Sequence, residues 1–252
     1  MARPVTLITG ASAGLGAEFA RQCAKRGEPL ALAARRRDRM EALAKEIGGE
    51  VHVFEADLSR EGAAASLIAE LAAEGLSVDT LINNAGFGLA GKFADRPLER
   101  QSGMIELNIR ALTELCHLVL PGMRERGAGA ILNVASTAAF QPGPNMAVYY
   151  ATKAYVLSFT EALHHELKGT GIRVSALCPG PTTSEFSDVA DSHSPTLERM
   201  KMPAEPVVRT GLAGLDRNKA VVIPGFTNKV GAQASRFLPR SSMRRIIGRI
   251  KV

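Results

Sequence analysis

The feature that most constrains the fold is an alternation of short apolar runs with stretches whose apolar residues recur at helical spacing. The apolar runs predict seven buried strands, at residues 5–9, 30–34, 51–55, 80–82, 130–134, 173–177 and 220–223. The stretches between them predict helices, at residues 15–25, 39–47, 63–74, 104–123 and 148–167. Strands that alternate with helices form a parallel sheet with helices on both faces. The sequence therefore predicts an α/β fold with a doubly wound, seven-stranded sheet, in a single domain over residues 1–252.

The charge balance argues against nucleic-acid binding. The chain has a net charge of +6, but seven basic side chains and no acidic ones lie between residues 229 and 252. The positive charge therefore belongs to a basic C-terminal tail, and the rest of the chain is close to neutral.

The cysteines and histidines indicate neither a metal site nor a disulfide framework. Cys23, Cys116 and Cys178 are widely spaced and form no CxxC pair, which suits buried thiols in a reducing compartment. The five histidines lack a zinc-binding spacing. The N-terminus leads into the first predicted strand without a signal-peptide pattern. We therefore expect a cytoplasmic protein without a metal.

A glycine-rich turn, TGASAGLG at residues 9–16, follows the first predicted strand. Ligands of doubly wound sheets bind beyond the carboxyl ends of the strands, where a helix N-terminus favours the pyrophosphate of a dinucleotide. Glycines in this Rossmann-like arrangement allow a tight turn and a close approach of the ligand. The spacing is GxxxGxG rather than GxGxxG, so an ordinary strand-to-helix connection is the alternative. The candidate binding residues of the turn are Gly10, Ser12, Ala13, Gly14, Leu15 and Gly16.

Basic side chains end the second predicted strand. An acidic residue near this point binds the ribose 2′-hydroxyl of NAD, whereas an arginine accommodates the 2′-phosphate of NADP. Arg35 and Arg36 come first here, and no acidic residue precedes Asp38. The pattern favours NADP(H) as cofactor, and a solvated basic start of a helix is the alternative. Candidate contacts to the adenine and the riboses follow the third and fourth strands, at Asp57, Leu58, Asn84, Ala85 and Gly86.

Tyr149 and Lys153 lie four residues apart on a predicted helix, so their side chains share one face. A phenol with an ordinary pKa near 10 is a poor acid or base at neutral pH. An adjacent ammonium stabilises the phenolate and lowers that pKa towards the working range. Ser136 follows the fifth strand, where its hydroxyl can hold a substrate oxygen. Taken alone, this tyrosine and lysine also suit an ordinary surface pair.

Taken together, these motifs resemble the short-chain dehydrogenase/reductase family. TGxxxGxG at residues 9–16, NNAG at 83–86, a serine at 136, YxxxK at 149–153 and a Pro-Gly pair at 179–180 occur in that family's order and at its approximate spacing. They span nearly the whole chain.

The resemblance implies an NADP(H)-dependent enzyme that transfers a hydride between cofactor and a carbonyl or secondary alcohol. It implies that Tyr149 is the general acid, that Lys153 holds the nicotinamide ribose and lowers the tyrosine pKa, and that Ser136 orients the carbonyl. Asn108 matches the helix asparagine of a water and proton relay. Pro179, Gly180 and Thr182 would flank the nicotinamide. Relatives commonly form homodimers or homotetramers. The rival interpretations are a non-catalytic NADP(H)-binding sensor on the same fold and an epimerase or dehydratase.

Two C-terminal segments bear on substrate and partners. Residues 182–206 contain Phe186, Leu197, Met200 and Met202 among polar residues, which predicts a partly apolar substrate lid, with a surface loop as the alternative. Such a lid suits an apolar ketone, aldehyde or 3-oxoacyl compound. In the basic tail, residues 229–252, an apolar stripe follows helical spacing, at Met243, Ile246, Ile247 and Ile250. We favour packing of this stripe on the domain or across a dimer over contact with an anionic membrane or an acidic partner, because isolated short helices are marginal.

Overall fold

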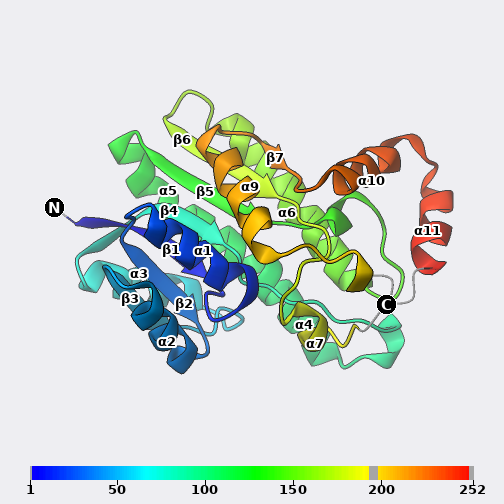
Figure 1. The fold of residues 1–252 in the computed structure, drawn as a ribbon, viewed down its shortest axis with the longest axis horizontal. Helices are drawn as coiled ribbons and strands as arrows, with labels where there is room; N and C mark the ends of the chain where they lie inside the picture. The colour runs from blue at the N-terminus through cyan, green and yellow to red at the C-terminus, as the bar shows by residue number, and fades with distance from the viewer. Residues whose placement is uncertain (1, 193–197, 250–252) are drawn as a thin grey trace.

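The computed structural model describes residues 2–192 and 198–249, and these form a seven-stranded sheet between two layers of helices (Figure 1). All paired strands are parallel, in the order β3-β2-β1-β4-β5-β6-β7. The strands are β1 (Arg3–Thr9), β2 (Leu30–Ala34), β3 (Val51–Glu55), β4 (Leu76–Asn83), β5 (Gly129–Val134), β6 (Ile172–Leu177) and β7 (Val221–Val222). The predicted α/β class and parallel sheet are confirmed.

Helices cover both faces of the sheet. One layer contains α1 (Gly14–Lys25), α2 (Arg37–Ile47) and α9 (Ala204–Asp216). The other contains α3 (Ala63–Ala73), α5 (Leu112–Arg126) and α6 (Ala147–Glu166). The remaining helices are α4 (Leu98–Ile105), α7 (Phe186–Val189), α10 (Phe226–Phe237), α11 (Arg240–Arg249), the 3-10 helices η1 (Phe93–Asp95) and η3 (Thr137–Phe140), and the π-helix η2 (Glu106–Ala111).

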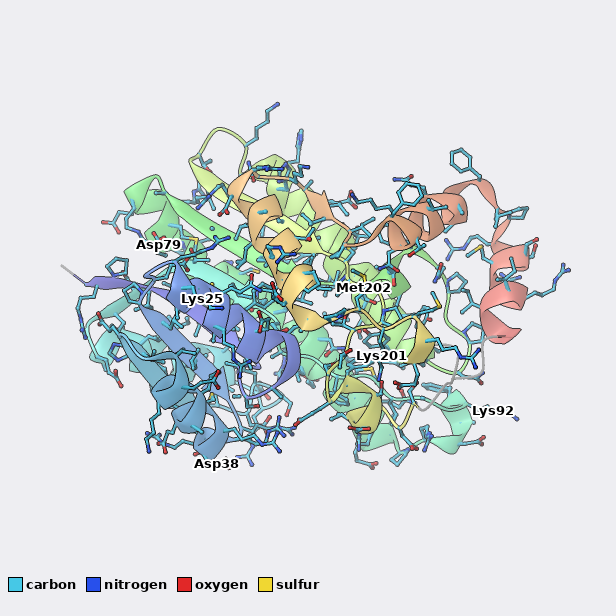
Figure 2. The ribbon with its side chains drawn as sticks, in the orientation of Figure 1. Lys25, Asp38, Asp79, Lys92, Lys201 and Met202 are labelled. Carbon is cyan, nitrogen blue, oxygen red and sulfur yellow. The ribbon has the colours of Figure 1, made fainter. Side chains whose placement is uncertain are left out.

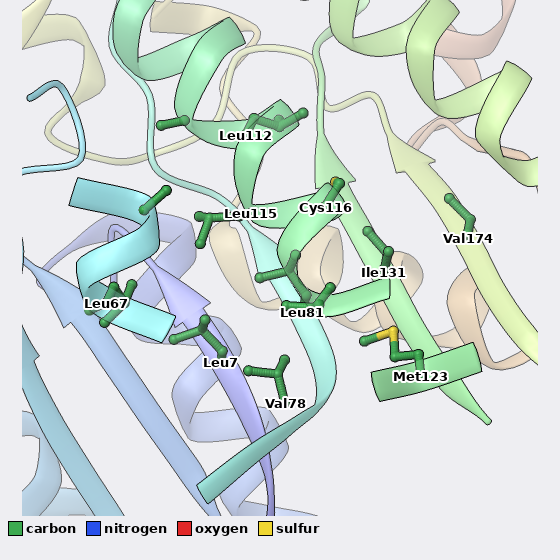
Figure 3. Close-up of a cluster of buried hydrophobic side chains, with 14 of the residues drawn as sticks. Leu7, Leu67, Val78, Leu81, Leu112, Leu115, Cys116, Met123, Ile131 and Val174 are labelled. Atoms are coloured by element: carbon green, nitrogen blue, oxygen red, sulfur yellow. The ribbon is translucent and has the colours of Figure 1, made fainter. Parts of the chain in front are cut away.

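The core follows from the alternation of side chains along buried strands. Leu7, Leu81 and Ile131 point to the layer of α3, α5 and α6, where they meet Leu67 and Leu115 (Figure 3). Their neighbours along the same strands, Ile8, Ile82 and Leu132, point to the opposite layer. Successive side chains of a strand face opposite sides, so apolar runs without alternation suit strands that are buried on both faces.

The direction of the chain reverses between β1 and β4. The first three strands run outwards in the order β1, β2, β3, and the chain then crosses back to place β4 beside β1. Connections leave the carboxyl ends of these two strands in opposite directions, which opens a crevice at that edge. The glycine-rich turn after β1 and the turn after β4 both lie there.

Several elements differ from the sequence-based prediction. The helix expected over residues 104–123 consists of α4, the π-helix η2 and α5, because residues 106–111 take the wider π geometry. The strand expected over 80–82 begins earlier, at Leu76, which pairs with Arg3 of β1. The register between β1 and β4 then shifts between Val5 and Thr6. The helices α9 and α10 come from residues for which no helix was predicted.

Candidate active site

A cavity of about 520 Å³ lies at the carboxyl ends of β1, β4, β5 and β6. The sequence-predicted residues that line it are Gly10, Ser12, Ala13, Gly14, Leu15, Arg35, Arg36, Asp57, Leu58, Asn84, Ala85, Gly86, Ser136, Tyr149, Lys153, Pro179, Gly180 and Thr182. The structure therefore brings residues from seven separate segments to one hollow. Gly16 and Asn108 do not belong to this lining.

The glycines of the first turn have distinct physical roles. Gly10 has a φ of +66° and Gly14 a φ of +55°, a region that glycine enters without strain. A Cβ on Gly10 would lie 2.9 Å from the Cα of Ala85, so the turn touches the neighbouring strand end. A Cβ on Gly16 would lie 2.2 Å from the carbonyl oxygen of Gly10. Gly16 therefore permits α1 to pack closely against the turn. This packing role explains why Gly16 lies behind the cavity wall.

The N-terminus of α1 faces the cavity and suits an anion. Its N-cap residue, Ala13, lines the cavity and makes no capping hydrogen bond with its side chain. The first amide N–H groups of a helix lack partners within the helix, and the helix dipole favours negative charge there. The geometry therefore fits the pyrophosphate of a dinucleotide.

Thr9 and Asn84 fix the turns after β1 and β4 relative to each other. The Thr9 hydroxyl accepts hydrogen bonds from the backbone N–H groups of Asn84, at 3.1 Å, and Ala85, at 3.0 Å. The Asn84 side-chain amide donates to the Thr9 carbonyl at 2.9 Å. These bonds hold the crevice open at a fixed width, because each turn satisfies the polar groups of the other.

The end of β2 presents arginine side chains to the cavity. The Arg36 guanidinium donates to the Ser12 hydroxyl, at 3.3 and 3.2 Å, and forms an ion pair with Glu185 at 2.9 Å. Arg35 lines the cavity beside Asp57. A hydrogen bond from Ser59 lowers the pKa of Asp57, and the Arg35 charge adds to this effect. With two arginines and no carboxylate from β2 itself, this end fits a 2′-phosphate better than a free ribose hydroxyl.

Tyr149 lies in the first turn of α6 and shares the cavity wall with Ser136. Burial raises the pKa of Tyr149 to about 12, while the Ser136 hydroxyl acts in the opposite direction. The phenol is therefore protonated at neutral pH, which is the form that a general acid requires. Ser136 caps η3, where its hydroxyl oxygen accepts from the backbone N–H of Ala138 at 3.1 Å. The Ser136 hydroxyl also donates to the Pro179 carbonyl at 3.5 Å, and Ser136 lines the cavity.

Lys153 is only 5% exposed, although lysine is rarely buried. Its Nζ donates to the Val134 carbonyl at 2.8 Å and lies 5.9 Å from the centroid of the Tyr149 ring. Burial lowers the pKa of Lys153 to about 8. The sequence reasoning expected Lys153 to lower the pKa of Tyr149, but in this structure burial raises that pKa, and the effect that opposes burial comes from the Ser136 hydroxyl.

Asn108 is buried in the π-helix η2 and acts behind the cavity wall. Its side-chain amide donates to the Phe87 carbonyl at 3.0 Å and to the Thr152 hydroxyl at 3.1 Å, and its oxygen accepts from the Phe87 N–H at 3.1 Å. Thr152 in turn donates to the Tyr149 carbonyl at 2.7 Å. Asn108 thus ties the turn after β4 to the first turn of α6. Single π turns inside α-helices often accompany functional sites.

The segment after β6 contributes both apolar and polar side chains to the cavity lining. The Phe186 ring lies 5.2 Å from the Tyr149 ring and packs in one cluster with Met146 and Tyr150, and Met200 also lines the cavity. Residues 181–183 pair with Met202 through backbone hydrogen bonds, which returns the segment to the sheet edge. Figure 2 shows Lys201 and Met202 at the N-terminal end of α9. The predicted lid, residues 182–206, therefore borders the cavity in its described part, and Leu197 lies outside the described residues.

The basic tail packs on the domain. Met243 and Ile247 of α11 are buried, and Ile247 lines the cavity. Ile246, which the sequence places on the same apolar stripe, is instead 47% exposed, because the buried face of α11 is narrower than the predicted stripe. Ile250 lies outside the described residues. The stripe thus provides a cavity wall, consistent with the packing interpretation.

Sequence reasoning missed several residues of the cavity. Tyr150 and Met146 lie beside Tyr149 without a motif of their own, and Glu185 carries no local signal. Asn228 of α10 packs on Gly180, where a Cβ would lie 2.5 Å from its side-chain oxygen. For the cavity residues of the C-terminal tail, the sequence offered one signal. The helical spacing of apolar residues predicted that Ile247 is buried.

The described residues, 2–192 and 198–249, contain no helix that is both long and apolar enough to cross a membrane. They also contain no group of three or more histidine, cysteine, aspartate or glutamate side chains arranged to hold a metal ion.

The doubly wound sheet, the uncapped helix N-terminus and the adjacent tyrosine, lysine and serine define a nicotinamide-dependent oxidoreductase. A family model described as short chain dehydrogenase matches residues 4–194. The chain belongs to the short-chain dehydrogenase/reductase family, and it is an NADP-dependent oxidoreductase that acts on CH–OH and C=O groups.

Named relatives agree with this assignment. The chain is 43% identical over 187 residues to sulfoacetaldehyde reductase 2 of Chromohalobacter salexigens, covering 73% of this chain and 74% of the relative. It is 36% identical over 187 residues to the NADP-dependent 3-hydroxy acid dehydrogenase YdfG of Escherichia coli K12, covering 73% and 75%. Among solved structures, a short-chain dehydrogenase from Sphingobium yanoikuyae in complex with NADPH is 34% identical, with a TM-score of 0.84 and coverage of 98% and 96%.

Proposed function

We propose that this protein uses NADPH to reduce the carbonyl group of a partly apolar ketone, aldehyde or 3-oxo compound, with Tyr149 as general acid. The observation that carries the proposal is that polar and apolar side chains line one cavity together. Ser136, Tyr149 and Lys153 line it, and so do the apolar side chains of Phe186 and Ile247, with the Phe186 ring 5.2 Å from that of Tyr149. A carbonyl group with an apolar substituent fits both kinds of side chain.

The chain's own residues have defined parts in this reaction. NADPH supplies the hydride that adds to the carbonyl carbon. The phenol of Tyr149 gives its proton to the carbonyl oxygen, so that the product is an alcohol and the atoms balance. The Ser136 hydroxyl donates a hydrogen bond to the oxygen while charge develops on it. Lys153 places an ammonium next to the phenolate that Tyr149 becomes, which favours the loss of its proton.

The same proposal says which residues would hold the cofactor. Arg35 and Arg36 would bind the 2′-phosphate, the N-terminus of α1 would bind the pyrophosphate, and Pro179, Gly180 and Thr182 would border the nicotinamide. The support for this placement is that one continuous cavity runs from the arginines to Tyr149.

Lys201 favours a second candidate function, in which the substrate carries an acidic group. Lys201 lines the cavity with a side chain only 15% exposed, where it pairs with Glu198 at 2.6 Å. A substrate carboxylate or sulfonate would replace Glu198 as its partner. Two relatives are named for sulfoacetaldehyde and for 3-hydroxy acids, so 3-oxo acids belong in any substrate panel.

We also propose that the enzyme works as a homodimer or homotetramer in the cytoplasm, with residues 182–206 as substrate lid. Leu98, Ile105 and Tyr155 are exposed apolar side chains on α4 and α6, which suits an interface between copies. Cys23, Cys116 and Cys178 are free and buried, which suits a reducing compartment.

The test follows NADPH absorbance while ketones, aldehydes, quinones, 3-oxoacyl thioesters and 3-oxo acids are offered. Tyr149→Phe is expected to lower kcat at least 100-fold, because it removes the proton donor, while NADPH binding stays intact. Tyr150→Phe is the matched control, since Tyr150 lines the same cavity without a lysine four residues on. Equal activity of the two variants would place the acid elsewhere. NADPH binding without turnover of any carbonyl would favour a sensor.

A further inference from the structure

Glu185 joins the segment after β6 to the arginines beyond β2. Its carboxylate forms ion pairs with Arg36, at 2.9 Å, and with Arg39 in the first turn of α2. Arg36 also donates to Ser12 in the glycine-rich turn. Arg36 therefore links the glycine-rich turn to the segment after β6, and Glu185 is its anionic partner. Ser12, Arg36 and Glu185 all line the cavity.

The arginines need an anion at this position. Arg35, Arg36, Arg37 and Arg39 crowd the N-terminus of α2, where Asp38 is the acidic residue of the first turn and the helix dipole disfavours positive charge. Arg37 pairs with Glu41 at 2.8 Å. For Arg36 and Arg39 the acidic partner is Glu185, whose pKa is lowered by hydrogen bonds from Arg39 and Arg36. A carboxylate therefore lies where an anion of the cofactor is expected to bind.

We propose that Glu185 is an internal competitor for the 2′-phosphate of NADP(H). The Glu185 carboxylate pairs with Arg36 and Arg39 in the free enzyme, and the 2′-phosphate displaces it from Arg36. Glu185 thereby sets how strongly the enzyme prefers NADPH to NADH. The inference rests on the proposed position of the 2′-phosphate at Arg35 and Arg36.

The exposure of the ion pairs makes such an exchange feasible. The side chains of Arg36 and Glu185 are each 41% exposed, and that of Arg39 is 47% exposed. Exposed ion pairs contribute little to stability, because water screens them and both side chains lose freedom. A phosphate carries more charge than a carboxylate and offers more acceptor oxygens. It therefore displaces Glu185 from Arg36, and the lost ion pair costs little free energy. NADH has only a hydroxyl at this position and lacks the charge to compete.

The competitor lies on the segment that also reaches the catalytic tyrosine. Phe186, the next residue, packs on Tyr149 with ring centroids 5.2 Å apart. A Cβ on Gly88 would lie 2.7 Å from the Phe186 ring, so this ring fits closely into the wall. Binding of the 2′-phosphate therefore acts on the same segment that contacts the substrate side of the cavity.

The experiment measures the affinity of adenosine 2′,5′-bisphosphate and of adenosine 5′-monophosphate by calorimetry, on the full chain at low ionic strength. In Glu185→Gln the bisphosphate is expected to bind up to about five-fold more tightly, because the one exposed ion pair that competes for Arg36 is lost. The affinity for the monophosphate is expected to stay unchanged. Glu46→Gln is the matched control, because Glu46 forms a comparably exposed pair with Arg21, at 2.7 Å, and neither residue lines the cavity.

Separate outcomes decide the two ideas. An unchanged or weaker affinity of Glu185→Gln for the bisphosphate would overturn the competitor role, and a weaker one would indicate that Glu185 instead holds its segment over the bound cofactor. A gain of the same size in Glu46→Gln would also overturn it, because a general charge effect would then suffice. Arg36→Gln is expected to weaken the bisphosphate at least ten-fold. If Arg36→Gln and Arg35→Ala both leave this affinity unchanged, the proposed position of the 2′-phosphate is wrong, whatever Glu185→Gln does.

Discussion

The buried ammonium of Lys153 costs stability, and replacing it tests the electrostatics of the site. Its pKa falls from 10.5 to about 8, and each pH unit of such a shift is worth about 1.4 kcal/mol. The charge therefore destabilises the fold by about 3 kcal/mol at pH 7. Lys153→Met removes this penalty but leaves the Val134 carbonyl without its 2.8 Å donor, a loss of about 1–2 kcal/mol. We expect the variant to be inactive and about 1–2 kcal/mol more stable at pH 7.

The sign of the pH dependence gives a second, sharper criterion. Below pH 8 the lysine is protonated in both the folded and the unfolded state, and the whole penalty is present. Between pH 8 and 10.5 the unfolded state binds more protons, so the wild-type free energy of unfolding rises with pH relative to that of Lys153→Met. The advantage of the variant is therefore expected to shrink by about 2 kcal/mol between pH 7 and 9.5.

Urea unfolding of both proteins at pH 7 and at pH 9.5, without cofactor, measures this difference. Lys168→Met is the control, because Lys168 is exposed and its replacement changes the charge of the chain equally. A stability difference between wild type and Lys153→Met that does not change with pH would refute the reasoning. So would a variant that is less stable at both pH values, since the hydrogen bond to Val134 would then outweigh desolvation.

Two further variants test the cofactor side. Gly16→Ala is expected to lose at least 2 kcal/mol of stability, because the new Cβ would lie 2.2 Å from the Gly10 carbonyl oxygen, and unchanged urea unfolding would contradict this packing role. Arg35→Asp is expected to shift the ratio of kcat/KM for NADPH and NADH at least 100-fold towards NADH, because a carboxylate repels the 2′-phosphate and binds a ribose hydroxyl. Kinetics with both cofactors measure the shift, and an unchanged ratio would remove Arg35 from the 2′-phosphate site.

The sequence allowed prediction of the parts of the site that depend on short stretches of backbone. The positive φ of Gly10 belongs to a tight turn after a strand, and Tyr149 and Lys153 share a face through the period of one helix. Such features repeat at fixed spacing and are readable locally. The π geometry around Asn108 was not readable, because residues 106–111 have the composition of an ordinary helix.

The missed residues depend on contacts between distant segments. Glu185 pairs with Arg39, 146 positions earlier, and Ile247 reaches a wall shared with Met146. No periodicity within one segment encodes such contacts, since they follow from the way whole elements pack. The prediction for Ile247 succeeded only in part, because the apolar stripe indicated burial but not the cavity that the side chain would line.

Side chains from beyond the part of the chain that matches the family model also line the cavity. The match ends at residue 194, and the proposed chemical residues all precede that point. Met200, Lys201 and Ile247 line the cavity from beyond it. Under the proposed function, the residues of hydride and proton transfer therefore lie in the matched part of the chain, and we expect the later segments to decide which carbonyl compound is accepted. Exchange of residues 198–249 with those of a relative should accordingly alter KM for the carbonyl more than the affinity for NADPH.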